Sequence, residues 1–219
     1  MNGLARIPAH VVLIALGIVF VAPFAWMVLT SLKSLEEISR FPITIWPEEI
    51  RWENYVEVFD VIPFARYFLN TLLITVLSLI GQLFSAPLVA YSITKINWAG
   101  GKIIFPVVIA TMLLPYQVTM IPVYLIFKKM GLTGSMWPLV IPTFTAAPLY
   151  IFLLRQFFLS IPDSLLQAAK IDGASEWRTY WNIVLPLSRP ALTSVGIFTF
   201  LYTWSDFLGP LLYLSKAEQ

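Results

Sequence analysis

The sequence predicts an all-α membrane protein, a polytopic helix bundle with five transmembrane helices. Composition is the first observation: of 219 residues, 58% are hydrophobic and 12% charged, and the mean hydropathy is +0.80. Soluble domains carry about 25% charged residues, so this chain cannot cover a water-facing exterior, and disorder requires low hydrophobicity. The second observation is that the charges are confined to segments between long charge-free runs. Such runs predict helices inserted in a bilayer.

Each predicted span is a charge-free or nearly charge-free run. A helix needs about 20 apolar residues to cross the hydrocarbon core. Four runs satisfy this outright, and the fifth does so if one aspartate is tolerated. The predicted spans are 11–32, 67–94, 103–127, 137–157 and 191–213. A signal peptide is the alternative for the first run, but that run is long and bulky residues stand where small cleavage residues are expected. The whole chain, 1–219, is therefore expected to form a single transmembrane domain.

Several functional classes are disfavoured by residue content. The net charge of +2 gives no nucleic-acid footprint, and a chain with no Cys and one His offers no disulfide framework or His-rich metal site. No paired carboxylates or Ser–His arrangement suggests a membrane enzyme. The run Gly100-Gly101-Lys102 lacks the rest of a phosphate-loop pattern. We therefore predict no catalytic, metal-binding or cofactor-binding residues in this chain.

The segment between the first two spans reads as a water-exposed excursion. It covers residues 33–66 and contains seven acidic residues, with Trp46, Trp52 and Tyr55 as expected interfacial anchors. Basic residues are equally numerous on the two predicted sides of the membrane, seven on each. The orientation therefore does not follow from the excess of basic residues in cytoplasmic loops.

The long polar connection before the last span, residues 160–189, predicts a helix, a glycine turn and a second helix outside the membrane. Ser164 followed by Gln167 fits a capping box at the start of the first helix. Gly173 suits the positive φ that often ends a helix, and Ser175 can cap the second helix. A structured loop of this kind indicates a docking element for another protein.

Short motifs in this loop carry a family resemblance. They are Gln167-Ala168-Ala169, Asp172-Gly173-Ala174 and Leu185-Pro186, with flanking matches such as Asn54-Tyr55, Asn70-Thr71, Leu114-Pro115 and Trp204-Ser205-Asp206-Phe207. This pattern resembles the EAA loop of importer permeases in ATP-binding-cassette (ABC) systems. The flanks are similar to the sugar branch, which includes the inner-membrane permease of the maltose transporter. The resemblance covers most of the chain.

The resemblance implies a permease subunit that moves a carbohydrate across a bacterial or archaeal cytoplasmic membrane as a multi-pass protein. Its implied partners are a second permease, two ATPase subunits that hold ATP and Mg, and an extracytoplasmic solute-binding protein. The loop 160–189 would be cytoplasmic and couple to the ATPase through Gln167, Ala168, Ala169, Asp172, Gly173 and Ala174.

Two departures from the family pattern stand out. The leading Glu of the motif is Gln167 here, which replaces a charge-assisted contact by a neutral one. The chain also ends after five predicted spans where the branch usually has six, so we expect a fragment or a truncated product.

Candidate pathway residues are Asp206, Asn70 and Gln82. Asp206 is the only acid in a predicted span, and an ionisable residue there is a functional candidate by default. The alternative is a solvated or helix-pairing position. Gln82 lies with Ser78 and Ser85 on one face of the second span, where helix packing is favoured over sugar contact.

A self-contained secondary carrier or channel is the alternative function. Such proteins carry charged relays within their spans and inverted repeats. Here Asp206 is the single intramembrane acid, and the halves of the sequence show no convincing repeat. The permease reading is therefore preferred.

Overall fold

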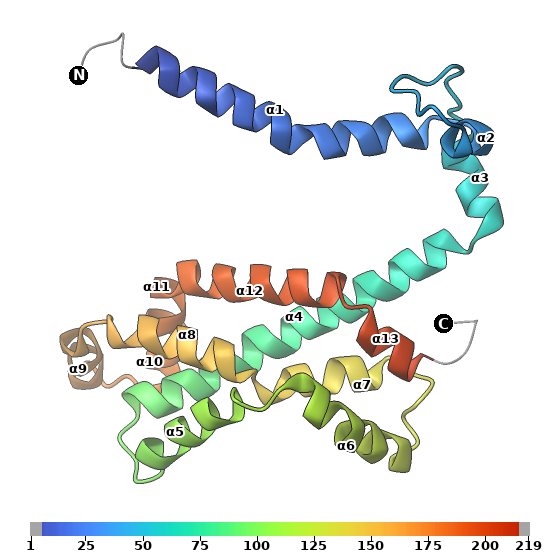
Figure 1. Ribbon diagram of the computed structural model, residues 1–219. Helices are drawn as coiled ribbons and strands as arrows, with labels where there is room; N and C mark the ends of the chain where they lie inside the picture. The colour runs from blue at the N-terminus through green and yellow to red at the C-terminus, as the bar shows by residue number, and fades with distance from the viewer. Residues whose placement is uncertain (1–5, 215–219) are drawn as a thin grey trace. The chain divides into compact units, whose positions relative to one another are not determined.

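The structure is a computed structural model, and it describes residues 6–214. Every regular element in that part of the chain is helical (Figure 1). Three helices are long and apolar enough to cross a membrane, or five segments if each of two bent helix pairs counts as one span. The chain forms two compact units that divide between Ala65 and Arg66, and each is described separately.

The first unit contains one long helix and a structured polar segment. Helix α1, Arg6–Ser31, has 26 residues and covers most of the predicted span 11–32. The side chains described along this helix from residue 10 to 28 are exposed, as expected for a surface that faces lipid or another subunit. Two short helices follow: α2, Leu35–Ser39, and α3, Asn54–Val61.

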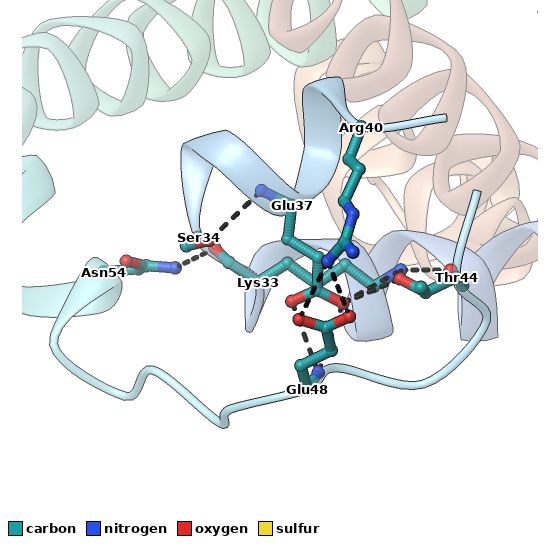
Figure 2. A network of polar contacts seen from close by, with 7 residues as sticks. All are labelled: Lys33, Ser34, Glu37, Arg40, Thr44, Glu48 and Asn54. Carbon is teal, nitrogen blue, oxygen red and sulfur yellow. Dashed lines mark hydrogen bonds and ion pairs between the residues drawn. The ribbon is translucent and has the colours of Figure 1, made fainter. Parts of the chain in front are cut away.

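A buried carboxylate organises the segment between α1 and α3 (Figure 2). The Glu37 carboxylate accepts hydrogen bonds from the Thr44 hydroxyl at 2.7 Å and from the Glu48 backbone N–H at 3.2 Å. The Lys33 ammonium lies 4.0 Å from Glu37 and donates to the Thr44 carbonyl. Asn54 Nδ2 donates to the Lys33 carbonyl at 2.9 Å. Glu37 and Lys33 are only 8% and 4% exposed, so this water-exposed excursion has a fixed polar centre.

The second unit begins with the longest helix. Helix α4, Phe64–Lys95, has 32 residues, is long and apolar enough to cross a membrane, and contains the predicted span 67–94. Small side chains let other segments approach it closely. A Cβ placed on Gly81 would lie 2.6 Å from Thr143 Oγ1 and 2.7 Å from a Phe144 ring carbon.

The polar face of α4 contributes to that packing. The Ser85 hydroxyl donates to the Thr143 carbonyl at 3.1 Å. The Gln82 amide, with its nitrogen toward Thr143, donates to the same carbonyl at 3.1 Å and accepts from the Ala147 N–H at 2.8 Å. These hydrogen bonds are of the packing kind favoured for Gln82 and Ser85 on the basis of the sequence.

The predicted single span 103–127 is wrong in detail, because the chain breaks there. Helix α5, Gly101–Thr111, and helix α6, Tyr116–Lys129, meet at 102°. Pro115 is extended, with φ −61° and ψ 141°, and has no N–H to continue a helical ladder. Residues before proline are also biased away from the helical region. Pro106 and Pro122 by contrast remain inside α5 and α6.

The fourth predicted span, 137–157, is present but interrupted. It comprises α7, Trp137–Val140, the 3-10 helix η2, Ile141–Thr145, and α8, Pro148–Leu159. Ala146 separates η2 from α8 at φ +62°, and Pro148 opens α8. Proline at the first helical position lacks a donor that would be unpaired anyway.

The remaining helices form the polar loop and the last apolar segment. They are α9, Asp163–Ile171; α10, Glu176–Thr179; the π-helical turn η3, Tyr180–Val184; α11, Leu185–Leu187; α12, Arg189–Trp204; and α13, Leu208–Tyr213. The predicted span 191–213 is therefore divided at residues 205–207. Helices α5 and α12 both pack on α8 (Figure 1). The core lies among α4, α8, η3 and α12, where Leu154, Phe158, Val184 and Val195 are fully buried.

Candidate functional site

The polar loop has the helix–turn–helix form expected from the sequence. Helix α9 ends in a Schellman motif: the Ala174 N–H donates to the Ala169 carbonyl at 2.9 Å, and the Gly173 N–H donates to the Lys170 carbonyl at 3.2 Å. Gly173 has φ +77°, which glycine adopts without a steric penalty. The glycine thus reverses the chain direction while the last carbonyls of α9 stay satisfied.

The predicted capping box at Ser164 is wrong. Helix α9 begins two residues earlier than that cap implies, at Asp163, and its N-cap position is Pro162, which makes no side-chain cap. Ser164 therefore lies inside the first turn, and Asp163 supplies a negative charge near the positive end of the helix. The second cap is confirmed, because Ser175 Oγ accepts from the Arg178 N–H at 3.2 Å.

Two side chains of α4, Lys95 and Tyr91, fasten the loop to the end of this helix. Lys95, the last residue of α4, has its Nζ 2.6 Å from Asp163 Oδ1, and it also donates to the Ile161 carbonyl at 2.8 Å. The Tyr91 hydroxyl donates to Glu176 Oε2 at 2.9 Å. One contact holds the start of α9 and the other the start of α10, so both loop helices are tied to the same membrane helix.

An aromatic cluster completes this attachment. Tyr180 is 2% exposed, and its ring centroid lies 5.2 Å from that of Tyr91. Trp177 and Trp181 contact Tyr180 with centroids 5.8 and 5.5 Å away. Buried aromatic pairs add about 0.5–1.5 kcal/mol beyond the area that they bury. The second loop helix therefore packs directly against α4 through this cluster.

The π-helical turn in this segment precedes a proline. Pro186 has no N–H, and in a regular α-helix its ring would clash with the carbonyl four residues before it, that of Asn182. The wider turn at Tyr180–Val184 relieves this conflict without ending the helix.

The six residues predicted to contact an ATPase do not all share one surface. Gln167, Ala168, Asp172 and Gly173 are exposed, whereas Ala174 is half-buried and Ala169 is 8% exposed. A shallow hollow of about 350 Å³ lies between α9 and the helix after it, lined by Leu165, Ala168, Ala169, Asp172, Ala174, Arg178, Asn182 and Ile183. Gln167 instead lines the opposite hollow, beside Tyr91 and Lys95 of α4.

A second candidate site is a cavity of about 450 Å³ within the second unit. Its polar lining consists of phenols, hydroxyls, an amide and a carboxylate, namely Tyr116, Tyr150, Tyr202, Tyr213, Thr119, Thr143, Thr199, Thr203, Gln82 and Asp206. Asp206 is the only charged side chain in this lining.

Asp206 occupies the break between α12 and α13 rather than the interior of a helix. Its Oδ1 accepts from the Gly209 N–H at 3.1 Å, in the first turn of α13. A carboxylate accepting a backbone N–H at a helix start is favourable. Asp206 thus lines the cavity and also accepts a hydrogen bond at the start of α13, and its role in a pathway stays a prediction.

The cavity brings together two of the three candidate pathway residues, Gln82 and Asp206; Asn70 is not part of its lining. Sequence reasoning missed the tyrosines that surround them. The available signal was Pro115, because the break that it causes places Tyr116 at the beginning of α6, where it faces the cavity.

Comparison with known proteins defines the class. Residues 84–217 match the family described as binding-protein-dependent transport system inner membrane component. The chain belongs to this family. It is thus a multi-pass membrane permease, as the sequence motifs predicted.

Individual relatives are similar along most of the chain. The diacetylchitobiose uptake system permease protein NgcG of Streptomyces coelicolor is 32% identical over 93% of this chain and 67% of its own length. The protein LplC of Bacillus subtilis is 32% identical over 93% of this chain and 68% of its own length. The sn-glycerol-3-phosphate transport system permease protein UgpE of Yersinia enterocolitica is 31% identical over 95% and 76%.

The fold is also found in a solved structure. The crystal structure of a bacterial ABC transporter involved in the import of the acidic polysaccharide alginate contains a chain that matches with a TM-score of 0.84 at 25% identity. The match covers 100% of this chain and 78% of the other. The chain spans about two thirds of the length of the first relatives that it matches.

Proposed function

We propose that this chain forms, together with a second permease subunit, the membrane pathway of an ABC importer for a carbohydrate. Loop 160–189 would lie in the cytoplasm and dock on an ATPase subunit, and a solute-binding protein would deliver the substrate on the other side. ATP and Mg would be bound by the ATPase. The main observation behind the proposal is the pair of helices α9 and α10, which are joined by the turn at Gly173 and attached to α4 through Lys95 and Tyr91.

The loop has the properties of a mechanical coupling element. Its outer surface offers exposed small residues and an apolar side chain, Ile171, that is 86% exposed beside the Gly173 turn. Its inner surface is tied to α4 by charged, polar and aromatic contacts. A partner that moves the loop would therefore move α4, which also lines the cavity through Gln82.

The chemistry of the cavity supports a carbohydrate. Sugar hydroxyls need both donors and acceptors, which phenols, hydroxyls and an amide provide, and aromatic rings give apolar surface for sugar faces. Asp206 is the only charged group in the lining, so the cavity favours neutral or amino sugars over acidic ones. Two of the relatives are named for substrates of different kinds, one for diacetylchitobiose and one for sn-glycerol-3-phosphate.

Docking of loop 160–189 on the ATPase can be tested by substitutions that alter its exposed surface but leave its fold unchanged. Ala168→Asp places a charge on the hollow beside Asp172, whereas Ser164→Asp places the same charge on α9 away from that hollow. Co-purification of the permease with its ATPase and ATP-driven uptake should fall at least tenfold for Ala168→Asp only. Ala169→Asp is unsuitable because that side chain is buried.

Uptake assays in cells that lack the chromosomal gene for this chain can distinguish an ATP-driven importer from a self-contained carrier. Labelled uptake of neutral disaccharides should depend on this chain and stop when the ATPase carries a substitution that blocks hydrolysis. Uptake that persisted without hydrolysis would instead support a self-contained carrier.

A further inference from the structure

A basic cavity lies at the same end of the second unit as loop 160–189, apart from the tyrosine-lined cavity. Its volume is about 420 Å³, and it lies among the end of α4, the turn 96–100, the start of α5 and the side of α8. Three basic side chains line it, Lys95, Lys102 and Arg155, and no acidic residue does. Lys95 is already engaged by Asp163 and the Ile161 carbonyl. The charge available to a ligand therefore comes from Lys102 and Arg155.

Arg155 is held in place but not neutralised. Its guanidinium carbon lies 4.0 Å from the centroid of the Phe105 ring, which fixes the plane of the group. Its Nε is buried and has no hydrogen-bond partner among the described residues. In the described part of the chain, no carboxylate forms an ion pair with Arg155 or Lys102. The cavity lining therefore carries positive charge that no carboxylate of the described residues balances, and such a lining attracts an anionic ligand.

The cavity lies where two predicted spans meet the loop between them. The charge-free run of α4 ends just before Lys95, and that of α5 begins just after Lys102. Trp98 lines the cavity and donates its indole N–H to the Ser92 carbonyl at 3.0 Å. Tryptophan at the ends of spans is typical of the membrane–water interface.

We propose that this cavity binds the phosphate of an anionic phospholipid in the leaflet next to loop 160–189. Arg155 donates to the phosphate oxygens in a fixed plane, and Lys102 adds a flexible charge at the mouth. Basic pockets between membrane helices bind phosphate headgroups in this way. The bound lipid would bridge α5 and α8 immediately beside Lys95, the residue that anchors the loop. The site depends neither on the identity of the transported substrate nor on the docking of an ATPase.

The test measures lipid retained by the full chain, purified in detergent, by native mass spectrometry. Phosphatidylglycerol and phosphatidylcholine with the same acyl chains are titrated in parallel. The double variant Lys102→Gln/Arg155→Gln should bind phosphatidylglycerol about 30-fold more weakly. Each basic residue contributes about 1 kcal/mol to binding, and about 1.4 kcal/mol corresponds to a tenfold change in affinity. The control Lys128→Gln/Lys129→Gln removes two exposed charges at the end of α6 and should bind as the unmodified chain does.

Two further arms keep the result interpretable. Lys102→Gln alone changes an exposed residue, so it should fold normally and still lose about 5-fold in affinity. Inorganic phosphate at millimolar concentration should not displace the lipid, because it lacks the acyl chains. Equal affinity for both lipids, equal losses in the control variant, or full displacement by inorganic phosphate would each overturn the proposal.

Discussion

Lys95 Nζ lies 2.6 Å from Asp163 Oδ1, and this contact joins the last residue of a membrane helix to the first residue of the loop helix α9. The two partners differ in environment: the Lys95 side chain is 6% exposed and that of Asp163 is 75% exposed. Because an exposed carboxylate is well solvated on its own, much of the contact's value lies in positioning α9. The same ammonium satisfies the Ile161 carbonyl, which belongs to the turn before α9.

Replacing Lys95 by Met should separate loop and membrane helix while leaving the loop folded. The Ile161 carbonyl loses its donor, at a cost of about 1–3 kcal/mol. Amide exchange in residues 160–175 should increase and uptake should fall several-fold, with ATP hydrolysis less dependent on substrate. Lys170→Met removes an exposed lysine that pairs with Glu176 at 3.6 Å, and it should change none of these three quantities. Unchanged exchange in Lys95→Met would contradict this view of the contact.

Substitutions at Gly173 should follow backbone preference and not size. A Cβ there would meet nothing within 4 Å, so the φ of +77° is the only obstacle. Asn tolerates this region and Ala pays about 1–2 kcal/mol for it. We expect loop protection in hydrogen exchange to decrease in the order Gly, Asn, Ala. Equal behaviour of Asn and Ala would show that the turn is not limited by φ.

Close packing at Gly81 should be sensitive to a single methyl group. Gly81→Ala would force Thr143 and Phe144 away from α4 and should lower the melting temperature of the purified chain by several degrees. Gly196→Ala is the matched control, since its nearest neighbour, Leu83 Cδ1, lies at an ordinary 3.9 Å. A smaller effect at Gly81 than at Gly196 would contradict the packing described.

A substitution at Asp206 can separate the effect of its negative charge from that of its hydrogen bond to the Gly209 N–H. Asp206→Asn keeps an oxygen for the Gly209 N–H but removes the only charge in the cavity lining. We expect a stable protein whose uptake of amino sugars falls about tenfold while acidic analogues compete better. Gly209→Ala places a Cβ against the Asp206 carboxylate and 2.8 Å from Leu139 Cδ2, so it should impair uptake of every substrate. If Asp206→Asn left the competition pattern unchanged, the carboxylate would not select substrate charge.

The buried carboxylate of the first unit predicts a local stability effect. Glu37→Ala leaves the Thr44 hydroxyl and the Glu48 N–H without their shared acceptor and removes the negative charge that lies 4.0 Å from the Lys33 ammonium (Figure 2). Proteolysis and amide exchange across residues 34–54 should both become faster. Glu36→Ala, an exposed neighbour on the same helix, is the control and should have little effect.

The sequence predicted where apolar segments lie but not where they bend. Charge-free runs identify spans because lipid excludes charge, and this principle located α1 and α4 well. Hydropathy contains no information on backbone direction, so the breaks at Pro115 and at residues 205–207 were missed. Proline alone does not settle the question, since Pro87 and Pro122 remain inside helices whereas Pro115 does not.

The loop was more predictable than the cavity. Its turn depends on local rules, such as glycine at positive φ and a serine cap, which Gly173 and Ser175 obey. The cap assigned to Ser164 failed because the N-cap is Pro162, two residues earlier, and the helix begins at Asp163. The cavity combines α4, α6, η2 and α12, and such long-range assembly leaves no signal at any one position.

The break between α5 and α6 also has an experimental consequence. Backbone that leaves the helical ladder at membrane depth must meet protein or water, and Tyr116, the first residue of α6, faces the cavity. A hydrated cavity would admit small hydrophilic thiol reagents. Because the chain contains no cysteine, one introduced at Tyr116 or Thr119 would be its only thiol, and its labelling rate would report when the pathway opens during the transport cycle.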